Sequence, residues 1–165
     1  MPLSFADAPS HESPAPQTIR RCGRCNACCT GTLRLEIEGQ QVERDKPCRH
    51  CTREGCDIYV ARPAGCRSFT CGWLSAQSHL PEFMRPDQCG VILLLNRLHW
   101  RSVPVDLAVA VERRIPAQTL AWLIAYARQH RRPLIYQVDE EWEGVGPHEF
   151  GQALRRAVAQ GRRLW

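Results

Sequence analysis

The sequence predicts an α+β protein in which a small, irregular, cysteine-rich lobe stapled by metal precedes a short region of strands and helices. Nine of the ten cysteines fall between residues 22 and 71, a density that packing alone does not require. After Cys89 the chain instead carries apolar residues at strand and helix spacing. We therefore expect a disordered tail over residues 1–18, a cysteine-cluster domain over 19–89, and an α/β region over 90–165 packed on it.

The cysteine-rich part offers few regular elements. Leu33, Leu35 and Ile37 alternate with charged residues and predict a half-buried strand that ends at Gly39. Residues 46–72 are rich in Cys, Arg, Gly and Pro and show almost no periodicity. We expect metal bonds, rather than an apolar core, to hold this stretch.

The later part carries clearer signals. Apolar runs predict a buried strand over residues 91–95 and a second extended segment over 100–111, interrupted by Pro104. Apolar residues at i, i+3, i+4 and i+7 predict helices over residues 116–131 and 148–161, with a strand at 134–138 between them. The acidic run that follows this strand is expected to be a solvated loop; it comprises Asp139, Glu140, Glu141 and Glu143.

The cysteines indicate metal binding. A thiolate is a soft ligand that suits zinc and iron-sulfur clusters, and two-residue spacings let neighbouring cysteines reach one ion from a tight turn. A disulfide framework is the alternative, but disulfide-dense proteins are secreted and usually small. The first 17 residues lack a charged segment followed by an apolar one, and no apolar run approaches the roughly 20 residues of a membrane span. We therefore expect a cytoplasmic protein.

The net charge of +5 invites a nucleic-acid interpretation, since 21 of the 22 basic residues are arginine. Eight thiolates holding two zinc ions would lower the net charge to about +1, which weakens that interpretation. Nucleic acid is therefore not the expected partner, and no membrane is expected. Paired arginines in the C-terminal region, such as Arg113 and Arg114, offer contacts to an acidic protein partner or form a solvated face.

The opening run Cys22-x2-Cys25-x2-Cys28-Cys29 begins like a bacterial ferredoxin motif but lacks its fourth member. Adjacent side chains in extended backbone point to opposite faces, so Cys28 and Cys29 can serve two different metal centres. This spacing favours a paired site.

A second element continues the signature: Cys48-x7-Cys56-Asp57-Ile58-Tyr59-x2-Arg62-Pro63-x2-Cys66-Arg67-x-Phe69-x-Cys71. Together with the opening run it closely resembles the CxxCxxCC family of zinc- or iron-chelating proteins, also called the YkgJ-type cysteine cluster family. The resemblance covers about residues 20–75. It implies metal binding by eight cysteines and leaves out Cys51 and Cys89; the eight are Cys22, Cys25, Cys28, Cys29, Cys48, Cys56, Cys66 and Cys71.

Other residues of this stretch admit physical roles. Arg62 and Arg67 are expected to donate hydrogen bonds to thiolate or sulfide sulfur, and simple surface charge is the alternative. Tyr59 and Phe69 are expected to form a small core of the lobe. His50 is a weak candidate ligand, and Cys89, beside an apolar strand, is expected to be a buried small hydrophobe.

The sequence therefore predicts a module that binds zinc or iron, the latter as ions or as an iron-sulfur cluster. We expect this module to have a structural role, to handle metal or to interact with a partner. The same type of cysteine cluster occurs in a flagellin lysine methylase, so an iron-sulfur-dependent redox or methyl-transfer enzyme is the alternative. A zinc-stabilised nucleic-acid binder is the third. No catalytic constellation is recognisable, which favours the binding module over an enzyme.

Overall fold

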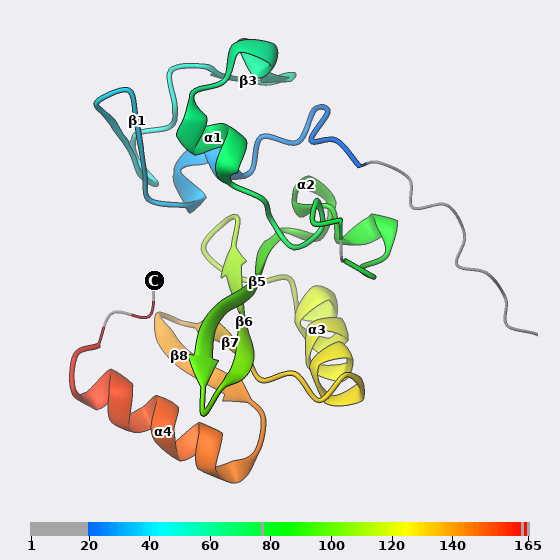
Figure 1. Cartoon of the computed structure of the whole chain (residues 1–165), viewed down its shortest axis with the longest axis vertical. Coiled ribbons are helices and arrows are strands. Elements are labelled where there is room, and N and C mark those ends of the chain that lie inside the picture. Colours follow the sequence, from blue (N-terminus) through cyan, green and yellow to red (C-terminus); the bar gives the residue numbers. More distant parts are fainter. Residues whose placement is uncertain (1–19, 77, 163, 165) are drawn as a thin grey trace, which may run out of the picture.

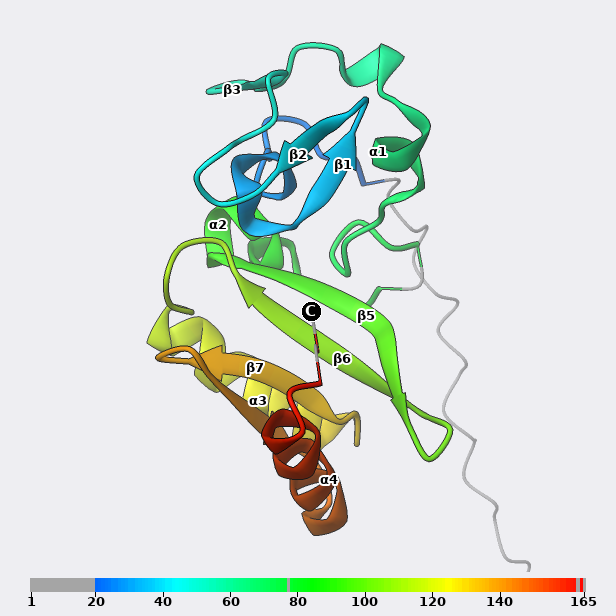
Figure 2. The same ribbon diagram turned by 90° about the vertical axis from the view of Figure 1, so that its left-hand side faces the viewer.

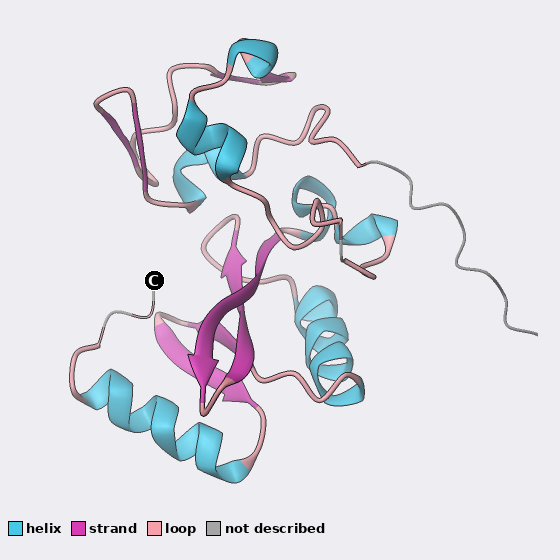
Figure 3. Cartoon of the chain, viewed as in Figure 1, coloured by secondary structure: helices cyan, strands magenta, loops and turns pink. Residues whose placement is uncertain are grey.

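The chain has an α+β fold, as predicted (Figures 1 and 3). The computed structural model describes residues 20–76, 78–162 and 164, so the predicted tail over residues 1–18 lies outside the described residues. A cysteine-bearing segment, residues 20–71, lies at one end of the molecule, and a four-stranded sheet with two helices lies at the other (Figure 1). No helix in the described part of the chain is long and apolar enough to cross a membrane.

The cysteine-bearing segment consists of short elements. A single π-helical turn, η1 (Cys28–Thr32), leads into an antiparallel hairpin of β1 (Leu35–Ile37) and β2 (Gln40–Val42), which confirms the predicted strand. Glu38 and Gly39 form its turn with positive φ angles of 49° and 77°. Residues 46–72, which show almost no periodicity in the sequence, form short elements: β3 (Cys51–Thr52), β4 (Gly55–Cys56), η2 (Tyr59–Ala61) and α1 (Ala64–Ser68).

The sheet has the order β5-β6-β7-β8. Its strands are β5 (Val91–Trp100), β6 (Val103–Ala110), β7 (Leu134–Val138) and β8 (Glu141–Val145). Neighbours are antiparallel except β6 and β7, which run parallel and are joined by the helix α3 (Ala117–Gln129). A parallel pair requires such a crossover. The second long helix, α4 (His148–Ala159), follows β8.

Two local expectations differ from the structure. Pro104 lies inside β6, opposite His99 of β5, rather than interrupting the strand. Because β7 pairs only with Asp106, Leu107 and Ala108 of β6, the proline lies outside that ladder and costs it no hydrogen bond.

The expectation of a solvated loop over the acidic run was wrong for its second half. Only Asp139 and Glu140 form a turn, at φ angles of 49° and 72°, while Glu141 and Glu143 belong to β8. Both glutamates are exposed and Trp142 between them is half-buried against the core, so the run is an alternating edge strand.

Both faces of the sheet are covered, and successive residues of β5 face opposite sides. Val91 and Leu93 pack with Leu123 of α3 and with Trp73, while Ile92 and Leu94 belong to the other core. That second core takes Phe150 and Leu154 from α4 together with Ala27 and Leu33 from the cysteine-bearing segment. The segment is therefore packed directly onto the sheet. The boundary predicted between residues 89 and 90 stays a prediction.

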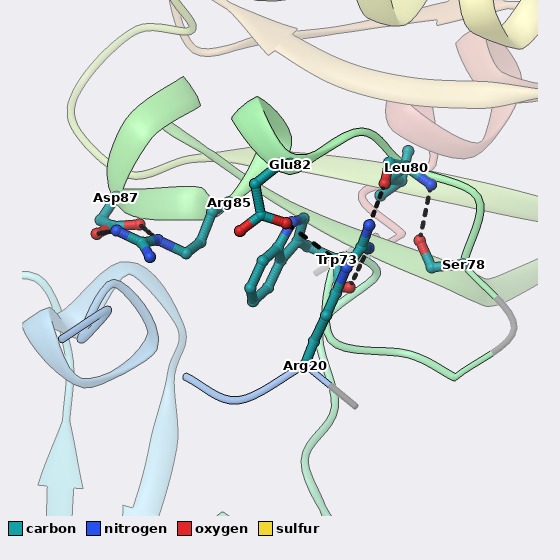
Figure 4. Close-up of polar contacts among 7 residues, drawn as sticks. All are labelled: Arg20, Trp73, Ser78, Leu80, Glu82, Arg85 and Asp87. Atoms are coloured by element: carbon teal, nitrogen blue, oxygen red, sulfur yellow. Dashed lines mark hydrogen bonds and ion pairs between the residues drawn. The ribbon is translucent and has the colours of Figure 1, made fainter. Parts of the chain in front are cut away.

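Arg20 ties the start of the described chain to the segment that precedes the sheet (Figure 4). Its guanidinium donates hydrogen bonds to the carbonyls of Trp73 at 2.8 Å and Leu80 at 2.6 Å, and lies 5.0 Å from the centre of the Trp73 ring. Glu82 of the short 3-10 helix η3 (Glu82–Met84) lies 3.9 Å from the same guanidinium. These contacts hold in place the backbone that directly precedes the first Cys-x2-Cys turn.

Candidate metal centre

Seven of the eight cysteines expected to bind metal surround one small cavity. Its volume is about 50 Å³. Apolar side chains, among them Leu35, Ile37 and Phe69, complete its wall. The cysteines that line it are Cys22, Cys25, Cys28, Cys29, Cys48, Cys56 and Cys66.

The eighth expected cysteine, Cys71, lines a second cavity of about 40 Å³. Cys22, Cys25, Cys28 and Cys66 line this cavity as well, so the two spaces share much of one wall. Cys51 and Cys89 line neither cavity. The structure therefore brings together the same eight cysteines that the family resemblance implies.

The electrostatic effects of the thiols on one another associate Cys71 with Cys22 and Cys25, and they associate Cys66, like Cys51, with Cys29, Cys48 and Cys56. Burial raises the pKa of Cys71, and Cys22 and Cys25 raise it further. Burial likewise raises the pKa of Cys66, with Cys29, Cys48 and Cys56 next in effect. We call Cys22, Cys25, Cys28 and Cys71 the first thiol group, and Cys29, Cys48, Cys56 and Cys66 the second thiol group.

Cys28 and Cys29 form the junction between the two groups. Their sulfur atoms lie 3.7 Å apart. The hydrogen bond between them lowers the pKa of Cys29 to about 7, with Arg62 contributing in the same direction, and raises the pKa of Cys28. Cys29 is thus the thiol of this pair that is poised to ionise.

Tight turns explain the position of the thiols. The amide of Cys25 donates to the carbonyl of Cys22, and the amide of Cys51 donates to that of Cys48, both at 2.9 Å. The amide of Cys48 also donates to the carbonyl of Cys29 at 2.9 Å, which brings two distant parts of the chain together.

Backbone amides also face several of the sulfur atoms. Burial raises the pKa of Cys25, Cys56 and Cys71, but backbone amides lower it by donating hydrogen bonds to the thiolates. These amides belong to Ala27 at Cys25, to Ile58 at Cys56, and to Leu74 and then Trp73 at Cys71. Amide donors of this kind stabilise the charged form of a cysteine.

The two arginines with an expected role lie in different surroundings. Arg62 lines both cavities, and it lowers the pKa of Cys66 as well as that of Cys29, although other causes are larger at each thiol. Its guanidinium lies 3.7 Å from the centre of the Tyr59 ring, and its Nε donates to the Tyr59 carbonyl at 2.9 Å. Arg67 is exposed in the last turn of α1 and lines neither cavity.

Three further residues with expected roles line the first cavity. Tyr59 and Phe69 are both half-buried and line the first cavity. His50 also lines it, with its Nδ1 3.0 Å from Oδ1 of Asp57 across the β3–β4 turn. The contact with Asp57 could not be read from the spacing alone.

The two remaining cysteines differ from each other. Cys51 is paired with Cys56 in the β3–β4 hairpin, and burial, then Cys29, Cys48 and Cys56, raise its pKa. It therefore lies beside the second thiol group without lining the cavity. Cys89 is buried, and its thiol donates to the carbonyls of Met84 and Val91, which confirms the expectation of a buried small side chain.

All ten cysteines are free thiols in the structure. No group of three or more His, Cys, Asp or Glu side chains in the described part of the chain is arranged so that it could hold a metal ion as it stands. The eight thiols converge on shared cavities but do not meet at a common point. The expected ligand set and the expected metal stay predictions.

Comparison of the chain with protein-family models, with curated proteins and with solved structures found no match. The resemblance to the CxxCxxCC family rests on the sequence motif, that is the cysteine spacing with the Ile58-Tyr59 and Arg62-Pro63 elements, and likewise stays a prediction.

Proposed function

We propose that this protein binds zinc or iron, the latter as ions or as an iron-sulfur cluster, through its eight clustered cysteines. One observation carries the proposal: residues from three separated stretches of the chain bring the eight expected thiols to two adjoining cavities, and leave Cys51 and Cys89 outside. The two thiol groups supply four sulfur ligands each, which is the donor set of a structural zinc site or of a cluster. Binding would draw the four sulfur atoms of each group onto the metal.

The chemistry around the thiols supports this proposal. Amides that donate to Cys25, Cys56 and Cys71, and the positive charge of Arg62, favour the thiolate form that a metal requires. Apolar side chains such as Leu35 and Ile37 line the same cavity as the sulfur atoms and make their surroundings less polar. Ten free thiols are also what a reducing compartment maintains, and we therefore propose a cytoplasmic location.

The size of the cavities favours a binding module over an enzyme. Sites for organic molecules usually measure about 300 to 1,000 Å³. The two cavities, of about 50 and 40 Å³, have room for ions but not for a substrate beside them. We therefore propose a role in structure, in metal handling or in the interaction with a protein partner through the C-terminal region.

The test is metal content after purification without air, by elemental analysis together with a visible spectrum. We expect tightly bound zinc or iron at about one to two sites per chain, since eight thiolates furnish two four-sulfur environments. A brown protein that absorbs near about 400 nm would assign an iron-sulfur cluster, and a colourless one with bound zinc would assign zinc. Native protein that is metal-free and whose thiols all titrate rapidly would contradict the proposal.

A further inference from the structure

A groove lined by arginine side chains lies away from the cysteine cavities. Its volume is about 700 Å³, within the range of sites for small ligands. All of its lining residues are polar, and four of the seven are arginine. The residues of this basic groove are Arg34, Arg44, Arg113, Arg114, Gln137, Asp139 and Glu140.

The arginines of the basic groove come from separate parts of the chain. Arg34 and Arg44 flank the β1–β2 hairpin, whereas Arg113 and Arg114 follow β6. The hydroxyl of Thr32 donates to the carbonyl of Val111 at 3.1 Å and so holds these two segments together. Figures 1 and 2 both show the connection after β6 reaching towards the cysteine-bearing segment.

The groove also lies at a favourable place on the sheet. β6 and β7 are the parallel pair, and the residues that follow their carboxyl ends, Arg113 and Asp139, both line it. In sheets with parallel strands, ligands bind beyond the carboxyl ends of those strands.

The charges in the groove are not balanced from within. Asp139 forms an ion pair of 2.6 Å with Arg114. Among the described residues, no ion pair involves Arg34, Arg44 or Arg113, and only the carboxylate of Glu140 remains to offset them within the groove. The groove thus has more positive charge than its own carboxylates offset, and a bound anion would reduce the repulsion among these arginines.

The side chains that line the basic groove indicate which class of anion it binds. Proteins that dock on a partner bury aromatic or apolar anchors, and those that bind single-stranded nucleic acid stack bases on aromatic rings. The groove offers neither kind of side chain. Guanidinium forks match phosphate oxygens in pairs, and several of them together match a ligand with several charges.

We infer that the basic groove binds the phosphate chain of a small oligophosphate, with Arg34, Arg44 and Arg113 contacting its oxygen atoms. Two sources share this chemistry: a free inorganic oligophosphate and a nucleoside triphosphate. This inference is independent of the metal, because none of the groove residues lines a cysteine cavity.

The experiment titrates the full-length protein, as purified, with inorganic tripolyphosphate in a calorimeter at about 0.1 M salt, where charges more than about 10 Å apart are screened. We expect saturable binding with one tripolyphosphate per chain. The triple variant R34Q/R44Q/R113Q should weaken it by about tenfold or more, since hydrogen bonds between charged groups are among the stronger ones. Circular dichroism and metal content of each variant verify that the fold and the cysteine site are retained.

A second groove of about 480 Å³, which Arg128 and Arg131 line, supplies the matched control. The variant R128Q/R131Q removes two positive charges, against three in the triple variant, and should change the affinity by no more than about twofold, because attraction by overall charge is screened. Adenosine triphosphate replaces tripolyphosphate in a parallel titration. Equal affinity would assign the free phosphate chain, and tighter binding would assign the nucleoside triphosphate. Absence of binding, equal weakening by both variants, or tighter binding of a single-stranded oligonucleotide would overturn the inference.

Discussion

Cys48 and Cys51 are neighbours in one turn, yet they have different surroundings. Cys48 lines the first cavity, whereas Cys51 lies beside it, opposite Cys56 in a two-stranded hairpin. A serine hydroxyl is a poor replacement for a thiolate ligand. We therefore expect Cys48→Ser to lower bound metal by about one site per chain and Cys51→Ser to retain it, as measured by elemental analysis.

Cys89→Ser is the control for this pair, because its thiol only donates to backbone carbonyls in the sheet-side core. It should retain its metal. Metal loss in Cys51→Ser together with retention in Cys48→Ser would reverse the assignment of the ligand.

Arg62 and Arg67 provide a second comparison between single residues. Arg62 lowers the pKa of Cys29, after the larger effect of Cys28, and the resulting pKa is about 7. In the metal-loaded protein near pH 7 we expect Arg62→Gln to raise this pKa and so to weaken the retention of metal against a competing chelator, by about threefold to tenfold, because a proton competes with the metal for the Cys29 sulfur. Because the thiolate is the ligand, the difference should shrink as the pH rises above both pKa values.

The matched variant Arg67→Gln removes the same charge from an exposed position outside both cavities. It should leave the retention of metal unchanged. Retention is followed by elemental analysis after dialysis against the chelator, and equal weakening by the two variants would show that Arg62 has no special role.

Among the short elements, the turn η1 depends on Gly31. This residue has a φ of 89°, and a Cβ atom here would collide with the carbonyl group of Glu43 and the Cα of Arg44. The left-handed backbone costs a residue with a side chain about 1 to 2 kcal/mol, and overpacking adds about 1 to 3 kcal/mol. We expect Gly31→Ala to lower the free energy of unfolding by about 2 to 5 kcal/mol in urea titrations of the metal-loaded protein.

Gly39 is the comparison for this prediction, because its φ is 77° but nothing lies within 4 Å of a Cβ placed there. Gly39→Ala should lose only the backbone contribution of about 1 to 2 kcal/mol. Equal losses in the two variants would show that the contact between η1 and the end of β2 does not matter.

Helices of several turns, and strands with several paired residues, could be predicted from the sequence. β7 coincides with residues 134–138, and α3 and α4 fall within the two predicted helices, because each has a periodic apolar face. The sequence did not predict β8 because its carboxylates obscure the alternating pattern, in which Trp142 and Gly144 are the half-buried positions. β3 and β4, of two residues each, are too short to carry any period.

At the scale of the whole molecule, the family resemblance implies a set of eight cysteines but does not say which of them are neighbours in space. That Cys71 joins Cys22 and Cys25 depends on the path of the chain between them. The same holds for the basic groove, whose arginines meet only because the hairpin packs against the connection after β6. Contacts of this kind arise from tertiary packing, and no local pattern encodes them.

The distribution of the apolar core decides how the molecule should respond to the loss of metal. The cysteine-bearing segment adds Ala27 and Leu33 to the core of the sheet, and has a further buried cluster of only three residues, Ile37, Val42 and Cys48. Burial on this scale cannot offset roughly 1 to 2 kcal/mol of backbone entropy per residue. Structural zinc contributes on the order of 10 kcal/mol per site in small peptides, so metal should supply most of the difference.

We therefore expect a chelator to unfold the cysteine-bearing segment selectively. Hydrogen exchange should lose its protection over residues 46–72, whereas α3, α4 and the sheet should keep most of theirs, because their two cores are built largely from β5, β6, β7 and the helices. The Thr32–Val111 bond lies where the two parts meet and should mark the limit of the change. Unchanged protection across residues 46–72 after complete metal removal would show that packing, and not metal, holds this segment.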